Sequence, residues 1–599
     1  MCGIFGCVGK IEKEDAYACI ERIKHRGPDA MNIQQVEGAT LAHARLSIID
    51  TSELANQPFT DITQRYYIVF NGEIYNFIEL RRELENKGYI FTTQSDTEVL
   101  LYSYIEWGEE FQNKCNGMWA LAIWDDYEKK LFLSRDRFGV KPLYICFSDD
   151  NLYFASEMKA FFPIMKEIEP NLSLLNNGNF LGWEISDDCV IKKIGKFPAG
   201  HCATYYKQVY TVKKWWNLLD NLIEVPSKYE DQVELFREIF LDSCSIRMRS
   251  DVPIGTALSG GIDSSAVIGG MKQMHSKHNS ERVSKDWQHA FVASLSGTEI
   301  DETKYAKIAS DYVGIDCNLV EIDSKVDVLE LMRYLYICEV PYLTVPIPFI
   351  TTYKKIRESG IKVTLDGHGA DELFAGYGTG LLAACYDVGF ESDKIDALLK
   401  QYNEMCLVES RQTISKENFI RCAIGNNNQF YKKIRNDKLD CVNKSLYYET
   451  TCSTLPTLLR CYDRYSMANG LEIRMPFMDY RIVSFAFSIP WTSKIRSGYS
   501  KAIVRDMARP FMDQRILNRK DKIGFAAPMV DWLKGDWKEF ILDTINSKDF
   551  YESDLVNSLD ICIDYNEFLN KTDNCLYDGE RIWQKIVPYL WFKSIKESV

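Results

Sequence analysis

The chain has 599 residues and a formal net charge of −14, without a basic tract long enough to follow a nucleic-acid backbone. Its length favours two domains, and 46% hydrophobic with 26% charged residues is typical of soluble globular proteins. No leader peptide and no membrane-spanning apolar run is present, so we expect neither a nucleic-acid nor a membrane partner. The 18 scattered cysteines, with no C-x-x-C pair, are typical of reduced thiols in a cytoplasm.

The first informative residue in chain order is Cys2. Removal of Met1 would give this residue a free α-amino group beside its thiol, and the two together form a nucleophile with its own base. A cysteine at this position can also be an accident. The following segments decide between the two interpretations.

Three later segments supply groups that suit free glutamine. Arg45 lies on an otherwise apolar predicted strand, where a guanidinium can hold a carboxylate. Residues 67–76 predict a buried strand with a tight turn at Asn71 and Gly72, whose N–H groups suit an oxyanion. Asp96 is expected to open a helix and can hold an ammonium group. Each feature alone has an ordinary explanation, such as a turn or a helix cap.

Together these segments resemble the class II glutamine amidotransferase domain of the N-terminal nucleophile superfamily. The matching motifs are Met1–Ile4, His25–Asp29, Arg45–Ile48, Asn71–Asn76 and Ser95–Glu98. The resemblance implies Cys2 as the nucleophile and Asn71 and Gly72 as oxyanion donors. It implies a glutamine site made of Arg45, Asn71, Gly72, Glu73 and Asp96. It also implies that Arg26 lies on a mobile loop that covers the glutamine.

A polar stretch followed by a helical pattern of apolar residues marks the start of a second domain. Trp215-Trp216 starts a polar stretch, and an apolar helical periodicity opens at Val233. We therefore expect a glutaminase domain over 1–205, a connection over 206–230 and a synthetase domain over 231–599.

A glycine-rich loop marks the second expected site. An apolar strand over 252–257 enters Ser259-Gly260-Gly261, and a helix is predicted to start near Asp263. Such a loop brings backbone N–H groups close to phosphates, but the Gly-Lys-Ser/Thr ending of a Walker loop is missing. The string resembles the PP-loop of ATP pyrophosphatases, which implies binding of the pyrophosphate end of ATP.

A second strand and loop support this interpretation. Residues 361–365 predict a parallel strand, which is followed by Asp366-Gly367-His368-Gly369-Ala370-Asp371-Glu372. Paired carboxylates there can bring Mg²⁺ to a triphosphate. Basic strings over 500–505 and 519–525 can neutralise a leaving pyrophosphate. The ordinary explanation, a solvated basic face, stays open for these two strings, and charged residues over 463–474 can form a structural ion network.

Over nearly its whole length the chain resembles the glutamine-hydrolysing asparagine synthetase family. The resemblance implies an N-terminal αββα sandwich and a C-terminal parallel α/β nucleotide-binding domain with extra helices. It implies glutamine, ATP and aspartate as substrates and Mg²⁺ as cofactor, held by Asp263 and Asp371. The implied ATP-binding residues are Leu258, Ser259, Gly260, Gly261, Asp263, Ser264, Ser265, Ala293, Asp366, Gly367 and Lys501.

One position departs from the commonest family pattern. Many members have Ser-Gly-Glu-Gly where this chain has Asp366-Gly367-His368-Gly369, and a related branch has Asp-Gly-Gln-Gly. His368 is therefore either a catalytic base or a residue that shapes the loop. The acceptor is expected to be aspartate, with another small carboxylate such as a sugar uronic acid as the alternative. A non-catalytic protein that binds amino acids or nucleotides is the third interpretation. The oligomeric state is left open, and a homodimer is compatible with the sequence.

Overall fold

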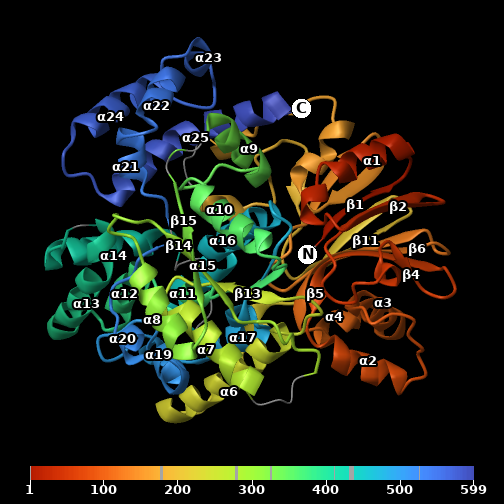
Figure 1. The fold of residues 1–599 in the computed structure, drawn as a ribbon, viewed down its shortest axis with the longest axis horizontal. Coiled ribbons are helices and arrows are strands. Elements are labelled where there is room, and N and C mark those ends of the chain that lie inside the picture. Colours follow the sequence, from red (N-terminus) through yellow and green to blue (C-terminus); the bar gives the residue numbers. More distant parts are fainter. Residues whose placement is uncertain are drawn as a thin grey trace.

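The computed structural model describes residues 2–175, 180–276, 281–323, 325, 327–410, 412–430, 438–524 and 526–598. Figure 1 shows two domains side by side, a sheet-rich N-terminal domain and a helix-rich C-terminal domain. Both expected fold types are confirmed: the first domain has antiparallel sheets, and the second is built on a parallel sheet.

The N-terminal domain contains two six-stranded antiparallel sheets. The first has the order β10-β8-β9-β1-β3-β2, with β1 Gly3–Val8, β2 Ala30–Val36, β3 Ala39–Arg45, β8 Tyr144–Ser148, β9 Asn151–Ala155 and β10 Ile194–Lys196. The second has the order β12-β11-β7-β6-β5-β4, with β4 Phe59–Thr60, β5 Tyr66–Ile74, β6 Gly117–Asp125, β7 Lys130–Arg135, β11 His201–Tyr206 and β12 Val209–Lys214. Apolar side chains from both sheets form a common core, among them Ile4, Leu41, Val69, Leu133 and Phe154.

Helices cover the outer faces of this sandwich. α1 Lys13–Glu21 contacts β1 and β3, while α2 Phe77–Glu85 and α3 Asp96–Trp107 lie on the other side, where α3 contacts β5. Short helices α4 Phe111–Lys114 and α5 Leu172–Leu175 complete the domain. Strand β12 pairs with β11, so the segment 206–230, predicted as a connection, begins with a strand of the N-terminal sheet.

The C-terminal domain is built on a five-stranded sheet with the order β15-β14-β13-β16-β17, in which every pairing is parallel. Its strands are β13 Ile254–Ala257, β14 His289–Ser294, β15 Cys317–Glu321, β16 Val363–Leu365 and β17 Glu472–Arg474. The expected opening helix is α6 Tyr229–Arg247. The glycine-rich loop separates β13 from α7 Ile262–Ser276, as predicted.

The remaining helices cover the sheet and extend away from it. Around the sheet they are α8 Thr303–Val313, α9 Val328–Cys338, α10 Ile347–Glu358, α11 Ala370–Phe374, α16 Thr454–Met467, α17 Tyr480–Ser488, α18 Trp491–Lys494, α19 Ala502–Ala508 and α20 Gln514–Leu517. Farther out are α12 Gly378–Asp387, α13 Ser392–Ser410, α14 Lys416–Phe430, α15 Cys441–Thr451, α21 Met529–Lys534, α22 Lys538–Ile545, α23 Lys548–Tyr551, α24 Ser558–Asn570 and α25 Leu576–Ser598. Among the described residues, no helix has the length and hydropathy needed to cross a bilayer.

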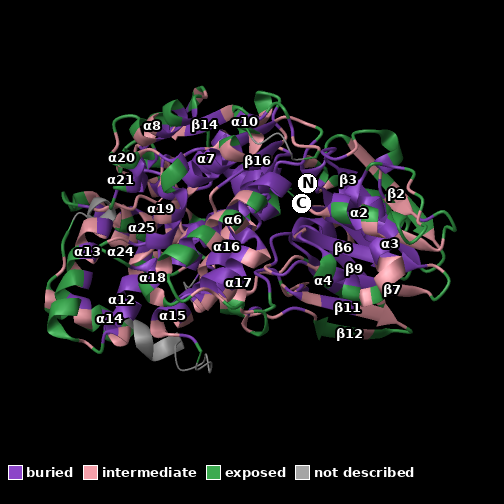
Figure 2. Ribbon diagram, turned by 90° about the horizontal axis from the view of Figure 1, so that it is seen from below, coloured by how far each residue is buried: buried purple, intermediate pink, exposed green. Residues whose placement is uncertain are grey.

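Buried charges join the two domains. The Arg26 guanidinium is fully buried and lies 2.7 Å from both Glu157 of its own domain and Asp463 of the C-terminal domain. Arg464 pairs in turn with Glu339 at 2.7 Å. The resemblance implied that Arg26 covers the glutamine from a mobile loop, but the structure places it in this interface. Figure 2 shows buried residues in both domains where α16 and α17 face the sandwich. Because buried charges are costly unless paired, the network fixes one relative arrangement of the domains.

Candidate active site

The first candidate site surrounds Cys2 at the start of β1. A small cavity of about 30 Å³ is lined by Cys2, Arg45, Gly72, Glu73 and Asp96, five of the six residues expected there. Asn71, the sixth, accepts a hydrogen bond through Oδ1 from the Cys2 N–H at 3.1 Å. Its Nδ2 has no hydrogen-bond partner among the described residues, so this buried donor is free for a ligand oxygen.

The predicted turn at Asn71 and Gly72 is wrong. Both residues lie inside the nine-residue strand β5, where Asn71 is opposite Ala120 and Gly72 is opposite Trp119. Glycine is needed at this position for a different reason, because a Cβ on Gly72 would lie 2.1 Å from the Met118 carbonyl oxygen. The turn signal failed because the Asn-Gly pair serves close packing of the two strands.

Local structure orients the other polar groups of this cavity. Arg45 ends β3 and donates hydrogen bonds to the Ser52 carbonyl at 2.7 Å and to Asn56 Oδ1 at 2.8 Å. Asp96 begins α3, as expected, and its Oδ2 accepts a hydrogen bond from the Ile74 N–H at 3.0 Å. Burial raises the pKa of Asp96 to about 6.

Burial also controls the chemistry of the thiol. It raises the pKa of Cys2, although the Leu46 backbone and the Arg45 charge act in the opposite direction. The thiol is therefore mostly protonated at neutral pH, and its activation needs a base.

A residue of the second domain completes the first cavity. Glu472 of β17 lines it, although nearly the whole sequence separates this residue from Cys2. Arg474 is fully buried and lies 2.6 Å from Glu472 and 2.9 Å from Glu73. Sequence reasoning assigned Glu472 only to a structural network, because no local pattern shows that it reaches the Cys2 cavity.

The second candidate site lies at the carboxyl ends of the parallel strands, where ligands of open α/β sheets usually bind. Its main cavity has a volume of about 280 Å³. Seven of the expected ATP-binding residues line it: Leu258, Ser259, Asp263, Ser264, Ala293, Asp366 and Gly367. Gly261 and Lys501 line an adjoining cavity of about 60 Å³, whereas Gly260 and Ser265 line neither.

The glycine-rich loop is held against α8 and α7. Gly260 has φ +77°, and a Cβ there would lie 2.2 Å from the Ala306 backbone nitrogen. The Ser259 N–H donates to Ser264 Oγ at 3.3 Å, and the Gly261 N–H donates to Ser259 Oγ at 3.2 Å. The loop therefore places polar groups at the start of α7, where the helix dipole favours an anion.

Two carboxylates and two lysines lie at one end of this cavity. Lys501 Nζ is 2.6 Å from Asp263 and 2.5 Å from Asp371, and Lys522 Nζ is 3.0 Å from Asp371. Burial raises the pKa of Asp263 despite Lys501. Burial opposes ionisation of Asp371 too, but both lysines hold the pKa of Asp371 below its ordinary value.

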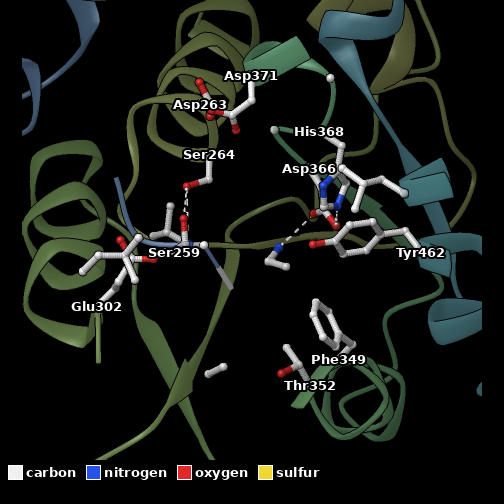
Figure 3. Close-up of a pocket in the computed structure, with 18 of the residues that line it drawn as sticks. Ser259, Asp263, Ser264, Glu302, Phe349, Thr352, Asp366, His368, Asp371 and Tyr462 are labelled. Carbon is white, nitrogen blue, oxygen red and sulfur yellow. Dashed lines mark hydrogen bonds and ion pairs between the residues drawn. The ribbon is translucent and has the colours of Figure 1, made fainter. Parts of the chain in front are cut away.

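The loop 366–369, whose sequence differs from the commonest family pattern, forms one side wall of this cavity (Figure 3). Asp366 Oδ1 accepts a hydrogen bond from the Ala257 N–H at 3.0 Å, and its Oδ2 accepts one from the Tyr353 hydroxyl at 3.0 Å. The His368 ring packs on Tyr462 with the ring centroids 3.7 Å apart, and its Nε2 has no hydrogen-bond partner among the described residues. This buried nitrogen lies 3.8 Å from Asp366 Oδ2, so His368 belongs to the cavity wall beside that carboxylate.

Comparisons with known proteins match each half of the chain to a family. Residues 1–216 match the glutamine amidotransferase domain family, and residues 235–572 match the asparagine synthase family. The second match alone covers more than half of the chain. The chain belongs to the asparagine synthase family.

Curated relatives span both domains of this family member. Glutamine-hydrolyzing asparagine synthetase 1 of Bacillus subtilis is 30% identical, and the alignment covers 99% of this chain and 96% of that protein. Synthetase 3 of the same organism is 28% identical over 87% of this chain and 86% of its own length. Amidase chry2 of Gibberella zeae is 25% identical over 87% of this chain and 86% of its own length.

The family implies Mg²⁺ as a cofactor. The side chains of the second candidate site, called the nucleotide cavity below, supply some of the oxygen ligands that this ion needs. Asp263 Oδ1 is a buried oxygen without a hydrogen-bond partner among the described residues, which suits an oxygen-seeking cation. No group of three or more ligating side chains occurs in the described part of the chain. A cation here would thus need oxygens from the nucleotide or water, as Mg²⁺ at phosphates usually does.

Sequence reasoning did not select every residue of the nucleotide site. Glu302, Lys522 and Tyr462 line the main cavity, and Glu302 lies 2.6 Å from Arg519. The basic string over 519–525 was the available signal for Lys522 and Arg519. The adjoining cavity brings five cations next to the glycine-rich loop, namely Lys501, Arg505, Arg519, Lys520 and Lys522.

Proposed function

We propose that this protein transfers nitrogen from glutamine to a carboxylate at the expense of ATP, through an acyl-adenylate, with aspartate as the acceptor. The observation that carries the proposal is the pairing of two sites in one chain. One is a buried thiol beside a free amide donor, and the other is a glycine-rich anion loop with lysine-bridged carboxylates. The curated relatives named as glutamine-hydrolyzing asparagine synthetases support this assignment.

In the first site, Cys2 attacks the side-chain amide carbon of glutamine. Because burial keeps the thiol protonated, its proton passes to the α-amino group that Cys2 carries once Met1 is removed. Asn71 Nδ2 and the Gly72 N–H stabilise the oxyanion. Arg45 holds the glutamine carboxylate, and Glu73 and Asp96 hold its ammonium group. The α-ammonium group gives its proton to the amide nitrogen, the C–N bond breaks and ammonia leaves. Water then releases glutamate from the thioester.

In the second site, the glycine-rich loop and the lysines hold the phosphates of ATP. Leu258 and Ala293 contact the adenine, and Asp366 and Gly367 border the nucleotide. The acceptor carboxylate attacks the α-phosphorus and pyrophosphate leaves, and Lys501 neutralises its developing charge. When bound by Asp263 and Asp371, Mg²⁺ would supply further charge neutralisation at the phosphates. Ammonia then displaces AMP from the acyl-adenylate.

The two sites are connected through β17. This strand supplies Glu472 to the Cys2 cavity, and its neighbour β16 leads directly into Asp366 of the nucleotide cavity. The Asp366 N–H donates to the Arg474 carbonyl at 2.9 Å. Two adjacent strands of one sheet therefore carry residues of both cavities, which supports coupling of ammonia release to its use.

A different acceptor is the second candidate function. Leu455, Leu458, Leu459 and Tyr462 of α16 give the cavity a partly apolar wall, and Lys522 already pairs with Asp371. A carboxylate with a larger body and a single charge would contact this wall more extensively than aspartate, and a sugar uronic acid is the alternative acceptor to be tested. Amidase chry2 shows that relatives carry names other than asparagine synthetase.

A pyrophosphate-release screen over candidate carboxylates, aspartate first, tests the proposal. We expect Cys2→Ala to lose glutamine-dependent synthesis but to retain ammonia-dependent synthesis, whereas Cys7→Ala on the same strand keeps both. Asp263→Asn and Asp371→Asn should lose pyrophosphate release while glutamine hydrolysis survives. Absence of pyrophosphate release with every carboxylate would favour a non-catalytic binding protein. Loss of both activities in folded Cys2→Ala would contradict the two-site assignment.

A further inference from the structure

A third cavity lies between the domains and belongs to neither site described above. Its volume is about 310 Å³, similar to the 280 Å³ of the nucleotide cavity. Its wall is formed by the loop after β7, the β10 region and the chain after β12 on one side, and by α15 and α16 on the other. None of the residues assigned above to glutamine or nucleotide binding lines it.

The lining is cationic although the protein as a whole is acidic. Five positive side chains face two carboxylates: Arg135, Arg137, Lys196, Lys214 and Arg460 against Glu184 and Asp187. Such a concentration of one sign of charge in a concave surface attracts the opposite charge.

Two of these cations are not neutralised by the protein. Arg135 donates hydrogen bonds to the carbonyls of Lys141 at 2.7 Å and Gly139 at 2.8 Å, and Arg137 donates to the carbonyl of Cys115 at 2.7 Å. Among the described residues, no carboxylate lies within salt-bridge distance of either guanidinium. Burial lowers the pKa of Arg137 and of Arg135, which reflects the cost of charges without counterions.

Arg460 provides the donors that a ligand would use. Its side chain is 9% exposed, and it contacts Glu184 through Nη1. Its Nε and Nη2 are buried and have no hydrogen-bond partner in the described part of the chain. Unsatisfied guanidinium donors at a cavity wall suit a carboxylate or a phosphate group.

One part of the remaining lining is apolar. Phe138 and Trp216 meet edge to face with their ring centroids 5.1 Å apart, and Val140, Leu143, Phe197 and Leu218 extend this surface. We propose that this interdomain cavity binds an organic anion, with its carboxylate or phosphate at Arg460 and its apolar body against Phe138 and Trp216.

Arg460 lies on a helix whose other residues contact both candidate sites. α16, which carries Arg460, also supplies Tyr462 to the nucleotide cavity. The next residue, Asp463, pairs with Arg26, whose Nε donates to the Cys2 carbonyl at 3.0 Å. An anion at Arg460 therefore contacts the helix that links the two sites, which suits an effector.

The test uses ligand-observed NMR with phenyl phosphate, benzoate and the neutral benzyl alcohol, in the presence of saturating ATP and glutamine to fill the other cavities. We expect at least one of the two anions to bind and the alcohol not to bind. The two anionic probes distinguish a phosphate from a carboxylate preference. Arg460→Gln should weaken binding of that anion at least about tenfold, because charge-assisted hydrogen bonds are lost.

Two neighbouring exposed lysines provide a matched pair of variants. Lys214 lines the cavity, whereas Lys213 lies on the alternate face of β12 and pairs with Glu109 at 3.3 Å. Lys214→Gln should weaken anion binding, and Lys213→Gln should not. Since Lys214 is exposed, this pair stays informative if Arg460→Gln does not fold. Equal binding of all three probes, no binding of either anion, or unchanged binding in Lys214→Gln would overturn the proposal.

Discussion

Arg474→Met tests how the two domains build the glutamine cavity. The wild-type guanidinium is fully buried between Glu73 and Glu472, at 2.9 and 2.6 Å, and donates to the Arg247 carbonyl at 2.9 Å. Methionine fills much of the volume but leaves two buried carboxylates without their cation. Removing one partner of a buried ion pair costs about 3–5 kcal/mol of the free energy of unfolding. Chemical denaturation of the variant and the wild type measures this loss.

The same variant should impair glutamine hydrolysis. Burial raises the pKa of Glu73 well above its ordinary value, and Arg474 opposes this shift. Without Arg474, the pKa of Glu73 rises further, so a smaller fraction of this carboxyl group is ionised to hold the ammonium group of glutamine. A glutaminase assay should therefore show a lower kcat/KM for glutamine.

Two further variants make this reasoning refutable. Arg481→Met removes a partly exposed guanidinium that pairs with Asp479 and Asp242. Asp479 keeps its other cation, Arg247, at 2.8 Å, so this variant should lose less stability than Arg474→Met. The double variant Arg474→Met/Glu472→Gln should lose less stability than Arg474→Met alone, because one uncompensated charge is gone. The argument fails if Arg474→Met costs as little as Arg481→Met, or if the double variant is less stable than the single one.

Three other predictions concern single residues. Burial raises the pKa of Asp96 to about 6, so this carboxyl group, which we propose holds the ammonium group of glutamine, is protonated below that pH. The kcat/KM for glutamine should therefore fall about tenfold per pH unit below pH 6, and a fall centred near pH 4 would contradict the assignment. Gly260→Ala should abolish pyrophosphate release, because its Cβ would lie 2.2 Å from the Ala306 nitrogen. The control Gly314→Ala, at φ +73° with no atom near its Cβ, should lose only about 1–2 kcal/mol of stability and keep activity. His368→Gln should keep ammonia-dependent synthesis, because glutamine can still pack on Tyr462; loss of that activity in a folded variant would make His368 a base.

The local elements of both sites could be predicted from the sequence. The helix that begins at Asp96, the arginine at the end of β3, and the strand, glycine loop and helix around Ser259 are determined by nearby residues. Periodicity and capping preferences act within a few residues, so they are visible in the chain itself. The exception is Asn71-Gly72, where pairing with β6 prevailed over the usual turn preference of this dipeptide.

The assembly of the sites required the tertiary structure. Glu472 reaches the Cys2 cavity, and Arg26 pairs with Asp463, only because the two domains pack in one arrangement. The cationic interdomain cavity likewise combines side chains from distant segments, and no pattern in the sequence brings Arg135 near Arg460. Sequence therefore determined the two chemistries, because each depends on short motifs. The contacts between them depend on long-range packing and electrostatic pairing, which local sequence does not encode.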